Sequence, residues 1–115
     1  MDPIFQFVEE VIEASRETYC AIADDIWDHP ETRFEEFWSA RRLADALEAE
    51  GFQLTRDAGG IPNAFIASLG EGQPVIALLG EFDALAVSAS QAHCAQPTSS
   101  TPGASGHGCG HNLLG

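Results

Sequence analysis

The sequence contains no lysine, and its only strongly basic side chains are five arginines, against 18 aspartates and glutamates. The formal net charge at neutral pH is -13. Nucleic-acid phosphates and anionic lipid headgroups repel such a surface, so we expect no nucleic-acid partner and no membrane-surface partner. An anionic substrate would need a metal ion or some of the few arginines in order to bind.

Long apolar runs and export signals are also missing. No stretch approaches the roughly 20 apolar residues that cross a bilayer as a helix. Residues 1–10 lack the basic flank, the apolar stretch and the cleavage site of a signal peptide. The three cysteines, Cys20, Cys94 and Cys109, are an odd number at irregular spacing, which is not typical of a disulfide-bonded secreted domain. These features predict a cytoplasmic protein with reduced thiols.

The first part of the chain predicts one long helix, from about Pro3 to about Trp27. Asp2 supplies a capping acceptor, Pro3 suits the first turn, and Pro30 prevents the helix from continuing. Cys20 is expected to be a small buried hydrophobe within this helix. Apolar residues recur at the three-and-four spacing of one buried face, at Ile4, Val8, Val11, Ile12, Tyr19, Ile22 and Ile26.

A second helix is predicted to begin near Thr32, because Thr32 and Glu35 have the spacing of a capping box. Gly51 is placed where a left-handed residue commonly ends a helix. Beyond it, residues 52–56 and 64–69 are strand candidates. The continuous apolar run at 75–79 predicts a central strand that is covered on both faces.

The order of these elements, two helices followed by sheet strands, predicts a layered α/β fold with a single domain over residues 1–115. Residues 87–106 have the composition of one long loop. Asn112 and the residues after it have the pattern of a helix that is just beginning. An unpaired sheet edge and an incipient helix predict a truncated chain.

His107, Cys109 and His111 are metal-capable residues separated by single glycines. Imidazole and thiolate are ligands that suit zinc or a similar first-row ion. The glycines disfavour a helix and allow tight turns, so that neighbouring ligands can converge on one point. On spacing alone, a glycine-rich turn with incidental histidine and cysteine remains an open alternative.

Glu81 and Asp83 follow the predicted central strand directly, where open α/β sheets place ligand-binding groups. Strand alternation puts both carboxylates on the same side, available to a metal or to a metal-bound histidine. Two solvated acids at a strand end are the alternative. His29 to Glu31 predict a turn with a helix-capping acid, and the loop pair at 93–94 is not assigned a site.

Three segments, 27–36, 80–85 and 106–115, occur in the order seen in a known family. The chain resembles the dinuclear metallopeptidases that include aminoacylases, hippurate hydrolases and bacterial carboxypeptidases. The resemblance implies that residues 1–115 are the N-terminal portion of an α/β/α catalytic domain, without the smaller dimerisation domain that interrupts it. It also implies two divalent metal ions, zinc or manganese, in the full-length protein.

The resemblance implies roles for three residues. Cys109 corresponds to a metal ligand that bridges the two ions, and His111 corresponds to a ligand of one ion. Asp83 corresponds to the catalytic acid that orients the metal centre. Glu81 stands where many relatives carry a metal-binding histidine, and neither Glu81 nor His107 is carried over as a ligand.

The implied activity is hydrolysis of the amide bond between an acyl or aryl-acyl group and an amino acid. The implied partners are a small N-acyl amino acid substrate and either a related subunit in a heteromer or a second copy in a homodimer. Family members carry a glutamate pair and further histidine ligands after the third segment, so residues 1–115 alone are predicted to be inactive. A non-catalytic interaction subunit of the same fold and a one-metal binding module are the alternatives.

Overall fold

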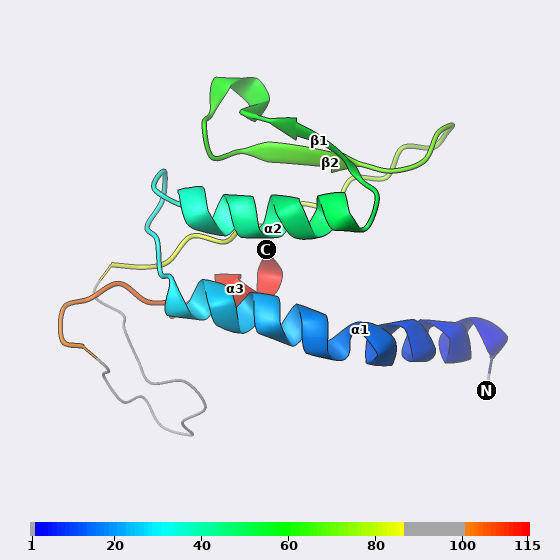
Figure 1. Ribbon diagram of the computed structural model, residues 1–115, viewed down its shortest axis with the longest axis horizontal. Coiled ribbons are helices and arrows are strands. Elements are labelled where there is room, and N and C mark those ends of the chain that lie inside the picture. Colours follow the sequence, from blue (N-terminus) through cyan, green and yellow to red (C-terminus); the bar gives the residue numbers. More distant parts are fainter. Residues whose placement is uncertain (1, 87–100) are drawn as a thin grey trace.

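The computed structural model describes residues 2–86 and 101–115. Two long helices, a β-hairpin and one short helix make up the fold. Figure 1 shows α2 lying between the hairpin and α1, and α3 beside the C-terminal half of α1. The elements are α1 (Pro3–Asp28), α2 (Phe37–Ala49), β1 (Gln53–Arg56), the 3-10 turn η1 (Ala58–Gly60), β2 (Phe65–Ser68) and α3 (His111–Leu114). Within the described ranges, no helix combines the length and the apolar character needed to cross a membrane.

Helix α1 has the bounds that its sequence predicts. The Asp2 carboxylate accepts a hydrogen bond of 2.8 Å from the backbone N–H of Ile4, which otherwise has no partner within the helix. Pro3 occupies the first turn, where its missing N–H costs nothing. The helix ends at Asp28, two residues before Pro30. The predicted start and stop signals are confirmed.

The predicted buried face of α1 is only partly correct. Ile22 and Ile26 are buried, but the other five residues of that face are 44 to 70% exposed: Ile4, Val8, Val11, Ile12 and Tyr19. Cys20 is also exposed, so its predicted burial is wrong. The reason is length, because α1 has 26 residues and α2 has 13. The N-terminal half of α1 extends past α2 in Figure 1, with no described element over its apolar side.

Helix α2 begins at Phe37, and the predicted capping box does not start it. Phe34 adopts a left-handed φ of 68°, which interrupts any helix begun at Thr32. The Thr32 hydroxyl instead donates to the side chain of Glu35 at 3.1 Å. The end of the helix is as predicted, since Gly51 follows it with a φ of 93°.

Glu31 caps α2 from outside the helix. Its carboxylate accepts hydrogen bonds from the backbone N–H of Trp38 at 3.0 Å and of Ser39 at 2.8 Å. The Ser39 hydroxyl donates to the same carboxylate at 2.7 Å. A negative charge at this position also interacts favourably with the positive end of the helix dipole. The prediction of a helix-capping acid after Pro30 is confirmed.

The sheet has two antiparallel strands, both at the predicted positions. Gln53 pairs with Ser68, and Arg56 pairs with Phe65. Helix α2 packs against both strands. Arg56 joins the hairpin to α2 through an ion pair of 2.9 Å with Asp45.

The predicted central strand at 75–79 is wrong for this structure. No strand forms there, and the side chains of Val75, Ile76, Leu78 and Leu79 are 77 to 96% exposed. A strand needs neighbours for its backbone N–H and C=O groups, and in the described part of the chain the sheet consists of β1 and β2 alone. The observed fold is thus mixed helix and small antiparallel sheet, which is compatible with an α/β class. The metallopeptidase catalytic domain stays a prediction.

The C-terminal residues form the incipient helix that the sequence predicts, α3, which begins at His111. Of the predicted loop at 87–106, residues 87–100 lie outside the described residues, and with them the pair at 93–94. Residues 101–106 contain turns and a single bridge, as expected for a loop.

Candidate functional site

Two isolated β-bridges bring the three segments of interest together. Thr32 forms a parallel bridge with Ala84, and Leu85 forms an antiparallel bridge with Gly106. The backbone N–H of Ala84 donates to the Glu31 carbonyl at 2.7 Å, and Leu85 and Gly106 exchange two hydrogen bonds of 2.9 Å. The segments at 31–32, 83–85 and 106 therefore run side by side, although they are far apart in the sequence.

Further contacts fix the position of α3 beside these segments. The side-chain amide of Asn112 donates to the Ala23 carbonyl in α1 at 3.3 Å. Gly80 lies so close to the end of α3 that a Cβ atom there would be 3.0 Å from the carbonyl oxygen of Leu114. Since only glycine avoids this contact, Gly80 allows the segment that carries Glu81 and Asp83 to approach His111.

Asp83 and His111 form the central contact of the candidate site. The Asp83 Oδ1 atom lies 2.8 Å from Nδ1 of His111. An ionised carboxylate can only accept a hydrogen bond, so Nδ1 of His111 must carry the proton and donate it. The neutral ring then has its free electron pair on Nε2, the arrangement found in metal-binding histidines whose other nitrogen donates to a carboxylate.

Glu81 faces the opposite nitrogen of the same ring. Its Oε2 atom lies 3.5 Å from Nε2 of His111. Strand alternation predicts Glu81 and Asp83 on one side, and both do reach the His111 ring. The side chain of His111 is 20% exposed and that of Glu81 is 68% exposed, so the space around Nε2 is open to solvent.

His107 is buried next to this group, with only 4% of its surface exposed. Its ring centre lies 6.5 Å from that of Trp27. Neither ring nitrogen has a partner at hydrogen-bonding geometry. Burial lowers the pKa of His107 below its ordinary value; the nearby Ile26 carbonyl opposes this shift, and the charge of His111 adds to it. His107 is therefore a neutral imidazole in the interior beside the candidate site.

Cys109 lies exposed in the turn between the two histidines, with a free thiol. Among residues 2–86 and 101–115, no group of three or more histidine, cysteine, aspartate or glutamate side chains is arranged to hold a metal ion. The Glu81 and His111 pair fits one side of a divalent cation, because a free nitrogen electron pair and a carboxylate oxygen face each other. The roles of Cys109, His111 and Asp83 at a metal stay predictions.

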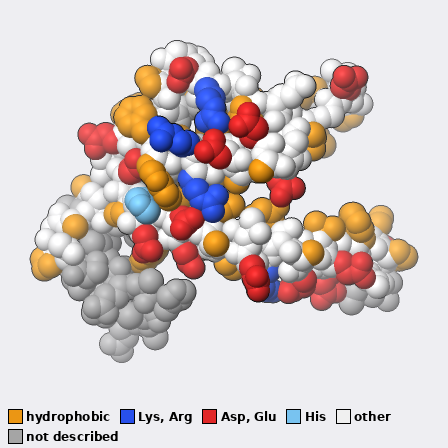
Figure 2. Space-filling view, viewed as in Figure 1, with side chains coloured by type: hydrophobic (Ala, Val, Ile, Leu, Met, Phe, Trp, Pro, Cys, Tyr) orange, Lys and Arg blue, Asp and Glu red, His pale blue; other side chains and the backbone are white. Residues whose placement is uncertain are grey.

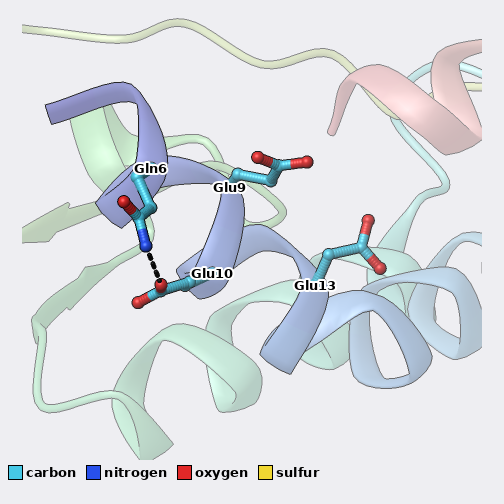
Figure 3. Close-up of a pocket in the computed structure, with 4 residues that line it drawn as sticks. All are labelled: Gln6, Glu9, Glu10 and Glu13. Carbon is cyan, nitrogen blue, oxygen red and sulfur yellow. Dashed lines mark hydrogen bonds between the residues drawn. The ribbon is translucent and has the colours of Figure 1, made fainter. Parts of the chain in front are cut away.

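A second hollow lies on the exposed N-terminal half of α1 and is lined by Gln6, Glu9, Glu10 and Glu13 (Figure 3). The Gln6 amide donates to Glu10 at 3.0 Å, and the side chains of Glu9 and Glu13 point away from that pair. All four residues come from one helix. The hollow is the solvated side of α1, without converging groups from another element.

Several arginines are engaged in ion pairs. Figure 2 shows blue arginine side chains over α2 and the hairpin, with red carboxylates next to them. Arg42 lies 2.9 Å from Asp25, and Arg56 lies 2.9 Å from Asp45 and 3.8 Å from Glu48. An anionic substrate would have to compete with these carboxylates for either guanidinium group.

Comparison with known proteins gives one informative match, and it covers the candidate site. The chain is similar to the B subunit of p-aminobenzoyl-glutamate hydrolase from Escherichia coli (strain K12). The two are 69% identical over 115 residues, which is 100% of this chain and 24% of the relative. The chain thus spans about a quarter of the length of the relative it matches. The three sequence segments predict a resemblance to this hydrolase in particular, and the comparison confirms it.

The other two comparisons add no match. No family model matches the chain. No solved structure is similar enough to support the fold independently. The name of the relative describes a hydrolase of p-aminobenzoyl-glutamate that is built from more than one kind of subunit.

Proposed function

We propose that the protein that carries this chain hydrolyses the amide bond between an acyl or aryl-acyl group and an amino acid, with p-aminobenzoyl-glutamate as the first substrate to test. The observation that carries the proposal is the 69% identity over the whole chain to a subunit of a hydrolase named for that compound. An identity this high over 115 residues supports a shared reaction class.

The proposed reaction depends on two divalent metal ions, zinc or manganese, with Cys109 and His111 among their ligands. When bound, such ions polarise a carbonyl oxygen and make water nucleophilic at neutral pH. Support comes from the orientation of His111, because Asp83 holds its Nδ1 at 2.8 Å and leaves Nε2 free. Asp83 would act by positioning the imidazole and by stabilising positive charge near it.

Residues 1–115 alone are proposed to be inactive. A catalytic zinc site has about three protein ligands and an open position for water, and the described residues contain no arrangement of three. The substrate carboxylates also need cations, and Arg42 and Arg56 are already paired. The other ligands, the general base and the substrate pocket would come from further parts of the full-length protein.

The proposed setting is the cytoplasm, and the proposed assembly is a heteromer with a related subunit or a homodimer. The name of the relative, which marks it as one subunit of a hydrolase, supports a partner subunit. The exposed thiols of Cys20 and Cys109 are consistent with a reducing compartment.

The test uses the full-length protein with Cys109→Ala or His111→Ala. We expect each variant to lose bound metal and most of the hydrolysis of p-aminobenzoyl-glutamate, measured by elemental analysis and by release of glutamate. Cys20→Ala is the matched control, because Cys20 lies on α1 and is exposed. Wild-type metal content and activity in both test variants would contradict the proposal and favour a non-catalytic subunit.

A one-metal binding module is the second candidate, favoured by the pairing of Glu81 with His111. It predicts that residues 1–115 alone bind zinc with sub-micromolar affinity. Titration of this chain with zinc in competition with a chromophoric chelator separates the two functions, because the incomplete site that we propose binds more weakly.

A further inference from the structure

We propose that Glu81 is a direct ligand, together with Nε2 of His111, of one divalent metal ion. This inference rests on the proposed function, since that function supplies the metal. Neither the resemblance nor the named relative assigns Glu81 this role. It differs from Asp83, which contacts the other ring nitrogen and acts as a positioning residue.

The first argument concerns the polarity of the atoms that face each other. Because Asp83 accepts the proton of Nδ1, the neutral His111 ring presents an electron pair at Nε2. The Glu81 carboxylate is also an electron-pair donor, and its Oε2 lies 3.5 Å from Nε2. Two such groups repel each other unless a cation lies between them, and a divalent metal ion or a second proton on the ring would fill that position.

The second argument concerns distance. A hydrogen bond from a ring N–H to a carboxylate spans about 2.7 to 3.2 Å, so the observed 3.5 Å is long for a proton-mediated contact. Zinc binds imidazole nitrogen and carboxylate oxygen at about 2.1 Å each, and two ligands at a tetrahedral angle are then about 3.4 Å apart. The separation of Oε2 and Nε2 suits two ligands of one metal ion.

The third argument concerns access. The side chain of Glu81 is 68% exposed, and that of His111 is 20% exposed. The open side leaves room for water and for ligands from other segments, which the pair needs because two ligands do not complete a zinc site. The backbone around the pair is held by the bridge between Leu85 and Gly106, so both ligands come from anchored segments.

The experiment compares Glu81→Gln with wild type in the full-length protein. Glutamine is nearly isosteric but lacks the negative charge, so we expect the affinity for zinc to fall by more than about tenfold, the smallest loss usual even for residues that only orient a metal ligand. Affinity is measured by competition with a chromophoric chelator on metal-free protein. Glu71→Gln is the matched control, since Glu71 is an exposed glutamate in the turn after β2, and it should keep wild-type affinity.

A second variant protects the test against misfolding. Glu81→His replaces one zinc ligand by another, so it should bind zinc more tightly than Glu81→Gln, and circular dichroism should match wild type for both. Wild-type zinc affinity in Glu81→Gln would overturn the proposal. So would a loss of hydrolysis with unchanged zinc affinity, because Glu81 would then act on water or substrate without holding the metal.

Failure of this inference can be told apart from failure of the proposed function. If His111→Ala and Cys109→Ala lose metal while Glu81→Gln keeps wild-type affinity, the hydrolase proposal stands and the ligand role of Glu81 is wrong. If none of the three variants changes metal content, both proposals are wrong.

Discussion

Asp83 and His111 are 28 residues apart in the sequence, yet the carboxylate oxygen of one lies 2.8 Å from Nδ1 of the other. This hydrogen bond decides which nitrogen of His111 is free. It also places a negative charge behind the ring, where it makes the free nitrogen a better electron-pair donor. The candidate site therefore depends on a contact between the segment at 81–85 and the start of α3.

Replacing Asp83 with asparagine should disturb the tautomer of His111. The asparagine amide can donate to Nδ1, which moves the ring proton to Nε2 and blocks the nitrogen that would bind a metal. We expect Asp83→Asn to lower zinc affinity about 10- to 100-fold in the full-length protein. Nitrogen NMR shifts of the His111 ring report the tautomer, and Asp45→Asn, at a surface ion pair, serves as control. An unchanged tautomer and affinity would contradict the positioning role.

Removing the carboxylate of Glu31 should destabilise the fold. It accepts hydrogen bonds from two backbone N–H groups and one hydroxyl at the start of α2. Loss of a helix cap costs about 1 kcal/mol, with a range of about 0.5 to 2, so Glu31→Ala should lower the free energy of unfolding by about that amount in urea denaturation. Glu35→Ala should have a smaller effect, because the Glu35 side chain bonds to Thr32 at an exposed position. Equal effects of the two substitutions would show that Glu31 is not the cap.

Replacing His107 with leucine should raise stability at neutral pH. Both ring nitrogens are buried without hydrogen-bond partners, and an unsatisfied buried polar group costs about 1 to 3 kcal/mol. We expect His107→Leu to raise the free energy of unfolding by about 1 kcal/mol. His29→Leu should have the opposite sign, because His29 stacks on Trp38 with ring centres 3.8 Å apart and contacts the Asp25 carbonyl at 2.8 Å. A destabilised His107→Leu variant would show that the ring has partners in solution.

The stability of the metal-free chain should fall as the pH decreases below about 6.5, the pKa of an unperturbed histidine. Burial lowers the pKa of His107 in the folded state, so the unfolded chain takes up this proton first. The contribution of the neutral ring is fully present above about 6.5 and is lost as the pH falls through the lower, folded-state pKa. Urea denaturation between about pH 7.5 and 5.5 measures this loss, which spans the unperturbed histidine pKa. The same pH series on His107→Leu should show a weaker dependence, and equal slopes would contradict the assignment to His107.

The candidate site could be predicted from the sequence by residue type but not by contact. A strand end indicates Glu81 and Asp83, and a glycine-rich turn indicates His111, but their mutual distances emerge only when those segments are adjacent. The resemblance assigns Glu81 no role, because Glu81 matches a histidine position in that family. Strand alternation with Asp83 was the available signal, and it did not say which ring nitrogen each carboxylate would meet.

By itself, the sequence determined the local elements of this protein. Asp2 and Pro3 start α1, and Gly51 ends α2, because these effects act within one helical turn and depend on residue type. The alternation after Gly51 likewise determined the two strands of the hairpin. The excess of carboxylates and its effect on binding partners also follow from composition alone.

Only the tertiary structure decided which apolar residues are buried and which side chains meet. Burial of α1 stops at its C-terminal half because α2 is shorter, and the apolar run at 75–79 stays exposed because no described strand lies beside it. The cap of α2 comes from Glu31, seven and eight residues before the N–H groups it accepts from. His111 meets Asp83 across 28 residues. Such contacts depend on which distant segments pack together, and the periodicity of a single segment carries no information on its neighbour.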